Sequence, residues 1–356
     1  MPPRRPLPDA DAPRASRLPD GFVRPEHVPD DAITSVFAVR PEQAGHRLDR
    51  WLSLELPRLT RTRAQAIVES WAYDARGRQL KASHRVREAE LIVVFRPRWE
   101  EPEAPRDVPT LHVDAHVVAV DKPAGLPVHP TARYHQNTLT AVLAERFPGE
   151  RVVLAHRLDR ETSGALLAAR SYEAERALKA AFAERRVHKT YLAVVHGVVR
   201  DDTFTVDAPM ALEGGAVSVK MCVRPESKGG MASVTHVQVV RRLDGYTLVA
   251  AHPETGRQHQ IRVHLAHAGH PLVGDKLYAH GDDVFLRCLD APPDAETAAL
   301  LMLPRHALHA HAVAFKHPTT GAPMRIEAPL PTDLRSFCDA RAAIDGRERL
   351  DGAAER

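Results

Sequence analysis

Residues 156–164 read His156-Arg157-Leu158-Asp159-Arg160-Glu161-Thr162-Ser163-Gly164. They join two apolar runs, 152–155 and 165–169, each of which has the length of a buried strand. Asp159 is therefore expected in the loop after a buried strand, where a side chain is held rigidly at the edge of a cleft. This placement makes Asp159 a candidate for chemistry.

The pentapeptide His-Arg-Leu-Asp-Arg occurs a second time, at residues 46–50. Here Leu48, Trp51 and Leu52 have the i, i+3, i+4 spacing of one helical face. The first copy is thus predicted to be helical and the second to be a strand with its loop, so the two are not a repeat. Asp49, on the surface of the predicted helix, is interpreted as an ion-pair or capping residue.

The other apolar runs of the chain predict an α+β fold. Strands outnumber helices and do not alternate regularly with them, which favours a mixed, largely antiparallel sheet. The predicted strands are 117–120, 152–155, 165–169, 190–195, 233–240, 247–251, 308–315 and 324–327, and the predicted helices are 139–147, 172–184 and 257–268.

The 356 residues are more than a usual single domain needs, and prolines mark the divisions between segments. Eight of the 29 prolines lie in the first thirty residues, and four lie between Pro97 and Pro109. The predicted segments are a largely disordered leader at 1–43, a small α/β module at 44–95, a stiff linker at 96–109, the larger domain at 110–330 and a C-terminal tail at 331–356 that is either frayed or helical.

The net charge of +3 is too small by itself to indicate a nucleic-acid partner, but it is unevenly distributed. Residues 1–43 carry a net −1, residues 44–95 a net +4, and the rest is neutral. A basic small module is expected of a phosphate-binding surface, with a solvated helical face as the alternative.

Residues 44–95 are predicted to form two short helices followed by a small hairpin, with Arg61 and Arg63 at the start of the second helix and further arginines on the hairpin. This arrangement resembles the S-four-type RNA-binding domain of ribosomal proteins and RNA-modifying enzymes. The resemblance implies that the module, including Arg61 and Arg63, binds RNA.

Four segments of the larger domain resemble, in the same order, the RluA-type pseudouridine synthases. They are 121–129, 156–164, 189–193, and 255–265 with its continuation 269–275. The resemblance implies a pseudouridine synthase fold and the isomerisation of uridine in RNA, in which the N1–C1′ bond is broken and a C5–C1′ bond is formed. It also implies that no cofactor takes part, and the missing metal-ligand spacing among the histidines and cysteines predicts no metal site.

The same resemblance implies roles for single residues. Asp159 is the essential carboxylate, acting either as the nucleophile at the sugar or as the base that takes the 2′ proton. Burial alone would favour its protonation, and Arg262 occupies the motif position of the partner that keeps it ionised. Tyr191 matches a tyrosine that stacks on the target base, and Arg157 matches an arginine that fills the gap left by the flipped nucleotide. Further contacts to substrate or RNA are expected from Arg160, Lys189, Arg257 and His259.

Two other functions are weighed against this one. A non-catalytic RNA-binding protein on the same fold would lack part of the set Asp159, Tyr191 and Arg262, and all three are present. A zinc-dependent base deaminase needs His-x-Glu and Pro-Cys-x-x-Cys motifs, which do not occur. The 21 histidines lack His-Glu-x-x-His spacing, so solvated or hydrogen-bonding roles are expected for them.

RNA is the expected partner, with ribosomal RNA favoured over transfer RNA and with neither DNA nor a membrane involved. The chain lacks a run of about 18 apolar residues, and residues 1–18 are unlike a signal peptide. Its three cysteines are odd in number and far apart, which fits a reducing compartment. We therefore expect a cytoplasmic protein, and the resemblance to the RluA-type pseudouridine synthases implies a monomer.

Overall fold

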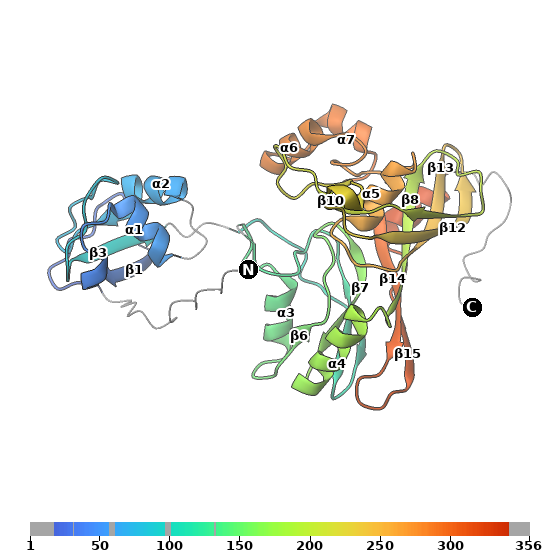
Figure 1. Ribbon diagram of the computed structural model, residues 1–356, viewed down its shortest axis with the longest axis horizontal. Coiled ribbons are helices and arrows are strands. Elements are labelled where there is room, and N and C mark those ends of the chain that lie inside the picture. Colours follow the sequence, from blue (N-terminus) through green and yellow to red (C-terminus); the bar gives the residue numbers. More distant parts are fainter. Residues whose placement is uncertain (1–17, 31, 57–60, 97–100, 132, 342–356) are drawn as a thin grey trace. The chain divides into compact units, whose positions relative to one another are not determined.

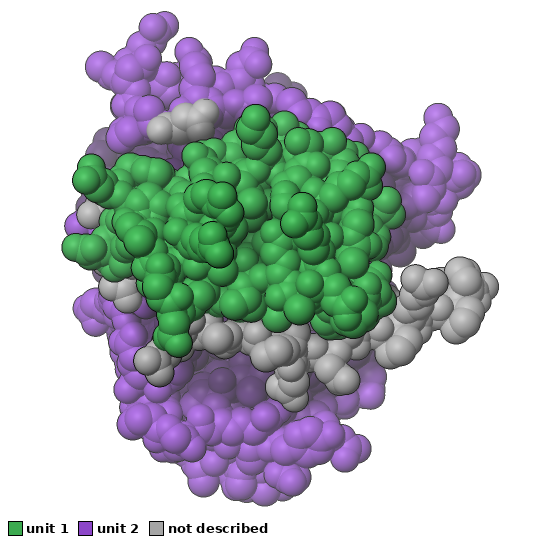
Figure 2. Space-filling model, turned by 90° about the vertical axis from the view of Figure 1, so that its left-hand side faces the viewer, with its two compact units in different colours: residues 1–100 green, residues 101–356 purple. Residues whose placement is uncertain are grey.

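The computed structural model describes residues 18–30, 32–56, 61–96, 101–131 and 133–341. The chain divides into two compact units, residues 1–100 and 101–356, which are coloured separately in Figure 2. Each unit has its own hydrophobic core, as separate domains do.

The first unit packs two helices on one face of a three-stranded antiparallel sheet. Leu48, Trp51 and Leu52 of one helix, and Ala64 and Val68 of the other, are buried against this face. The helical periodicity in the sequence is thereby confirmed. The elements are β1 Ile33–Ala38, α1 Leu48–Glu55, α2 Arg61–Trp71, β2 Ala72–Tyr73 and β3 Leu91–Arg96, and the sheet order is β1-β3-β2.

The prediction of an unstructured leader at 1–43 is wrong for the residues that form β1. This strand pairs antiparallel with β3 along its whole length. Val28, Val36 and Phe95 belong to a cluster on the sheet face opposite the helices. Composition indicated disorder here, but pairing with β3 satisfies the backbone groups of both strands. Residues 1–17 lie outside the described part of the chain.

The second unit is built on a ten-stranded mixed sheet (Figure 1). Its described strand pairs are antiparallel except for one parallel contact, which confirms the predicted α+β fold with a largely antiparallel sheet. The strands are β4 Thr110–Val113, β5 Val117–Lys122, β6 Val153–Leu154, β7 Ser163–Ala169, β8 His188–His196, β9 Thr203–Asp207, β12 Val234–Leu243, β13 Tyr246–Pro253, β14 Leu308–Lys316 and β15 Pro323–Glu327. Their order is β4-β5-β7-β14-β8-β13-β12-β9, with β15 on β14 and β6 on β7, and β10 Met210–Leu212 and β11 Met221–Val223 form a separate pair.

The one parallel contact, between β7 and β14, depends on a glycine. Gly164 has a φ of +115° and pairs with Ala310, whose carbonyl oxygen would lie 2.3 Å from a Cβ added at this position. A side chain there would push the two strands apart. The glycine that ends residues 156–164 therefore lets the loop of Asp159 lie beside β14.

Helices cover opposite faces of β5 because its side chains alternate. Val118 and Val120 belong to the cluster that includes α3, Leu139–Arg146. Val117 and Ala119 belong to the cluster that includes α4, Tyr172–Ala183. Both helices agree with those predicted from the sequence.

The same alternation places Tyr191 on β8. Ala193 and Val195 pack in the cluster that includes α5, Gln260–His267. Leu192 packs in the cluster that includes α8, Thr332–Asp339, on the other face. Tyr191 has the parity of Ala193, and it packs against the α5 cluster.

Described parts of two segments that composition placed outside the larger domain belong to it, whereas residues 97–100 and 342–356 lie outside the described part of the chain. The predicted tail at 331–356 contains α8, whose Leu334 and Phe337 are buried. In the predicted linker at 96–109, Val108 is buried, and the Glu101 carboxylate accepts hydrogen bonds from the backbone N–H groups of residues 135–137. These contacts are made with distant residues, so local composition does not reveal them.

The second unit also contains two helices that the sequence does not predict, α6 Asp282–Asp290 and α7 Ala295–Leu301. None of the described helices has the length and apolar character that crossing a membrane requires.

Candidate active site

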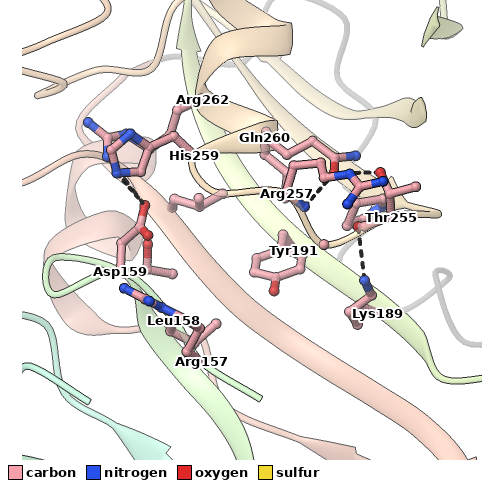
Figure 3. A pocket seen from close by; sticks show the side chains of 15 residues that line it. Arg157, Leu158, Asp159, Lys189, Tyr191, Thr255, Arg257, His259, Gln260 and Arg262 are labelled. Atoms are coloured by element: carbon pink, nitrogen blue, oxygen red, sulfur yellow. Dashed lines mark hydrogen bonds and ion pairs between the residues drawn. The ribbon is translucent and has the colours of Figure 1, made fainter. Parts of the chain in front are cut away.

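A pocket opens where the loop after β6, strand β8 and the segment before α5 meet (Figure 3). Figure 3 shows Tyr191 between Asp159 on one side and Lys189 on the other. The predicted site residues that line this pocket are Arg157, Asp159, Lys189, Tyr191, Arg257, His259 and Arg262. Segments that are about a hundred residues apart in the sequence therefore contribute to one pocket.

The loop that carries Asp159 is held by backbone hydrogen bonds. The Thr162 N–H donates to the Asp159 carbonyl at 3.1 Å, which closes a turn. The carbonyl of Arg160 accepts a bond from the Gly125 N–H at 2.8 Å and one from the buried Lys122 ammonium at 3.1 Å. The 121–125 segment thus fixes the position of the Asp159 backbone.

The Asp159 carboxylate lies at one end of a chain of three charges. The guanidinium of Arg262 donates from Nη1 to Asp159 Oδ2 at 3.3 Å. The same guanidinium makes a bidentate pair with Asp275, from Nε to Oδ2 at 2.7 Å and from Nη2 to Oδ1 at 2.9 Å. The Asp159 side chain is 24% exposed, whereas the side chains of Arg262 and Asp275 are 8% and 0% exposed. Asp275 therefore anchors Arg262 from inside the protein, and Asp159 faces the pocket.

The charge of Asp159 depends on Arg262. Burial raises the pKa of the Asp159 carboxyl. Neighbouring cationic groups lower the pKa by more than burial raises it, so the net pKa lies below its ordinary value. His259 and His306 are neutral at pH 7, because burial lowers the pKa of each to about 4. Arg262 is thus the neighbouring cation that keeps Asp159 ionised at neutral pH.

Tyr191 presents a neutral phenol to the pocket. Burial, and then the negative charge of Asp159, raise the pKa of its hydroxyl well above the ordinary value. The tyrosine is therefore protonated at neutral pH, and its half-buried ring offers an apolar face to a planar ligand.

The remaining charged residues of the pocket are basic. Arg157 and Arg257 are exposed, and Lys189 is half-buried, with its ammonium donating to the Thr255 carbonyl at 3.1 Å. Burial lowers the pKa of Lys189 to about 8, which leaves it largely cationic at pH 7. Among the described residues that line the pocket, Asp159 is the single carboxylate. The pocket is therefore basic around one half-buried anion, as a polyanionic substrate requires.

Comparison with known proteins identifies the family. A family model described as RNA pseudouridylate synthase matches residues 116–267. Ribosomal large subunit pseudouridine synthase D of Xanthomonas campestris is 36% identical over 330 residues, which cover 90% of this chain and 93% of that protein. The chain belongs to the RNA pseudouridine synthase family. The same-named protein of Pseudomonas aeruginosa is 33% identical to this synthase, over 85% of this chain and 94% of its own.

Solved structures also resemble the synthase. Human RNA pseudouridylate synthase domain containing 1 superposes with a TM-score of 0.54 at 26% identity, covering 68% of this chain and 91% of its own. Its counterpart, domain containing 4, has a TM-score of 0.51 at 28% identity, covering 64% and 90%. The architecture around the pocket is thus that of known members of the family.

Some predicted site residues of the synthase lie elsewhere. The Arg160 side chain donates to the Tyr134 hydroxyl at 3.2 Å and does not line the pocket. Helix α5 begins at Gln260 and not at residue 257, so Arg257 and His259 belong to the preceding loop. His259 has a φ of +56°, which ends the loop in a conformation that cannot extend the helix backwards.

Arg61 lies in the first unit and donates from Nε to Asp49 Oδ2 at 3.3 Å. Asp49 is buried and also pairs with Arg47, so the predicted ion pair is confirmed but its predicted place on the helix surface is wrong. The side chain of Arg63 lies outside the described part of the structure.

Residues outside the predicted set also shape the site. Asp275 belongs to the motif at 269–275, and an aspartate in an apolar segment is the signal that could have identified it. His306 and His309 are buried, not solvated, and they hydrogen-bond the hydroxyls of Thr162 and Ser163. The sequence predicted solvated or hydrogen-bonding roles for the histidines, and the hydrogen-bonding role is confirmed for these two. His309 in β14 and His306 in the segment before it thereby stabilise the end of the loop that carries Asp159.

Proposed function

We propose that this synthase isomerises uridine to pseudouridine in large-subunit ribosomal RNA, and that Asp159 is its essential group. The observation that carries the proposal is a single ionised carboxylate, paired with Arg262, in an otherwise basic pocket. The names of the bacterial relatives support ribosomal RNA over transfer RNA as the substrate.

The pocket residues suit the steps of the reaction. Breaking the N1–C1′ bond requires an anionic group at the ribose, and the Asp159 carboxylate supplies it either as a nucleophile at C1′ or as the base for the 2′ proton. The uracil must then turn so that C5 bonds to C1′, and the C5 proton is lost while N1 gains one. The neutral Tyr191 ring offers a stacking surface for the turning base, and Arg157 at the exposed edge suits the gap that a flipped nucleotide leaves.

The test uses the purified protein and large-subunit ribosomal RNA transcribed without modifications. We expect pseudouridine at specific positions without any added cofactor, detected by carbodiimide treatment and primer extension. Unmodified transfer RNA serves as the comparison substrate. Conversion of transfer RNA alone would overturn the ribosomal assignment, and no conversion of either RNA would overturn the proposed reaction.

We propose that the first unit anchors the RNA. Its residues 44–95 hold the net charge of +4, and the arginines at positions 50, 76 and 87 are exposed on its surface. Neutralising phosphates with such side chains releases counterions, so affinity falls as salt rises.

Replacing Arg50, Arg76 and Arg87 together by Gln is expected to weaken RNA binding and to reduce the slope of log K against log salt by about 0.9 for each phosphate that is no longer neutralised. Filter binding over a series of salt concentrations measures the slope. The matched control replaces three exposed arginines of the second unit, Arg176, Arg200 and Arg335, and should leave it nearer the wild-type value. Equal slopes for both triple variants would contradict the anchor role.

A further inference from the structure

Tyr278 contacts two residues of the pocket without lining it. Its hydroxyl lies 2.8 Å from Nδ1 of His259, and its ring lies 4.9 Å from the guanidinium carbon of Arg262. Its backbone N–H donates at 3.0 Å to Asp275, the carboxylate that anchors Arg262. Tyr278 is therefore held in place by Asp275, and it contacts both His259 and Arg262, the two neighbours of Asp159.

The hydrogen bonds of the Tyr278 hydroxyl determine where its proton points. The backbone N–H of Met221 in β11 donates to the hydroxyl oxygen at 3.0 Å, so the oxygen is the acceptor there. On its other side this oxygen faces Nδ1 of His259, which can accept a proton in a neutral imidazole. The hydroxyl proton is thus directed at Nδ1, and the proton of the neutral ring belongs on Nε2.

The Nε2 atom of His259 faces the reacting carboxylate. It lies 3.9 Å from Asp159 Oδ2. An N–H at this position attracts the carboxylate, whereas the lone pair of the other tautomer would repel it. His259 has a positive φ of +56°, a sparsely populated backbone conformation. The contacts of its two ring nitrogens, with Tyr278 on one side and Asp159 on the other, define the direction of the ring.

We propose that Tyr278 is a positioning residue of the synthase: its hydroxyl sets His259 in the Nε2–H tautomer, so that His259 presents an N–H donor to Asp159, while its ring stacks on Arg262. The inference rests on the proposed role of Asp159. It also explains why the Asp159 carboxylate keeps its orientation in the absence of RNA. The β10–β11 pair takes part, because it supplies the N–H that orients the hydroxyl.

The test compares Tyr278→Phe with Tyr246→Phe. The first removes only the hydroxyl and keeps the ring on Arg262. The second removes a hydroxyl that donates to Met302 Sδ, away from the pocket. We expect Tyr278→Phe to slow single-turnover pseudouridine formation about tenfold, which corresponds to the contribution of one hydrogen bond. The affinity for RNA should not change. Tyr246→Phe should match the wild-type rate.

A spectroscopic measurement separates this role from a merely structural one. Full-length protein labelled in its histidines with ¹³C and ¹⁵N reports the tautomer of His259 by NMR at pH 7.5, and a His259→Gln variant assigns the signal. We expect the Nε2–H form in the wild type and its loss in Tyr278→Phe.

The Nδ1–H form in the wild type, or the same tautomer in wild type and Tyr278→Phe, would overturn the inference. The wild-type tautomer alone can contradict the inference, so the test stands even if Tyr278→Phe does not fold. The tautomer is measured without RNA, so its result does not depend on pseudouridine formation. A wild type that forms no pseudouridine would instead contradict the proposed function, whatever the tautomer.

Discussion

An Asp159→Asn variant is expected to lose pseudouridine formation by about 10³-fold or more, which is the range for removing a group that transfers a proton or attacks the substrate. The amide has no negative charge, so it can neither bond to C1′ nor accept the 2′ proton. The variant should still fold, because Arg262 keeps its bidentate pair with Asp275. RNA affinity should stay near the wild-type value, since the basic residues of the pocket and of the first unit are untouched.

Single-turnover conversion of ribosomal RNA and filter binding measure the two quantities separately. The matched control is Asp244→Asn, in the Asp244-Gly245 turn between β12 and β13, where Asn-Gly suits a two-residue hairpin as well as Asp-Gly. It makes the same chemical change at an exposed site and should leave the rate unchanged. A wild-type rate in Asp159→Asn would remove Asp159 from the mechanism.

An Arg262→Gln variant is expected to lose about 3–5 kcal/mol of unfolding free energy at pH 7, the cost of leaving buried charges without their partner. Two carboxylates, Asp159 and the fully buried Asp275, both lose the cation that compensates them. Activity should fall as well, because burial would then favour the protonated form of Asp159. Urea unfolding, followed by circular dichroism, measures the loss.

The stability difference between wild type and Arg262→Gln should depend on pH in a defined direction. In the wild type the pKa values of Asp159 and Asp275 lie below their ordinary values, although burial raises them, because of attraction to cations that include Arg262. Their contribution to stability is present above about pH 4 and is lost as pH falls through the folded pKa values. In the variant burial raises both pKa values, so the charged forms destabilise the folded state at neutral pH. The difference is therefore expected to be largest near pH 7 and to shrink toward pH 4.

Two further variants serve as controls for the stability loss in Arg262→Gln. Arg262→Lys keeps the charge without the bidentate geometry and should recover part of the stability. Arg176→Gln, on the exposed face of α4, should change the unfolding free energy by no more than about 0.5 kcal/mol. A difference between wild type and Arg262→Gln that does not vary with pH would show that Arg262 does not set the charge of Asp159 or Asp275.

Much of the fold follows from local sequence patterns. The apolar runs predict most strands of the larger sheet, and the spacing of Leu48, Trp51 and Leu52 predicts α1. The strand β1 and the burial of helix α8 could not be predicted in the same way. Their composition is typical of leaders and tails, and their burial depends on β3 and on Leu192 and Leu248, which lie far away in the sequence.

Some residues of the site were identified from the sequence, and others were not. The sequence motifs indicate Asp159, Tyr191 and Arg262, and the structure brings them to one pocket. Tyr278 could not be given a role, because a tyrosine near an apolar segment is most often an ordinary core residue. For His306 the sequence predicted only a solvated or hydrogen-bonding role, without a partner. Their importance depends on a 2.8 Å contact with His259 and a 2.8 Å contact with Thr162, respectively.

The two copies of His-Arg-Leu-Asp-Arg show what the sequence alone determined and what it left to the tertiary structure. The flanking residues determined that the first copy is helical and that the second ends a strand, because hydrophobic periodicity is local. The tertiary structure decided the state of each aspartate. Asp49 is enclosed by two arginines of its own unit, whereas Asp159 shares Arg262 with Asp275 and faces a pocket. The difference arises because the charge of a buried carboxylate depends on which distant side chains the strand order places beside it.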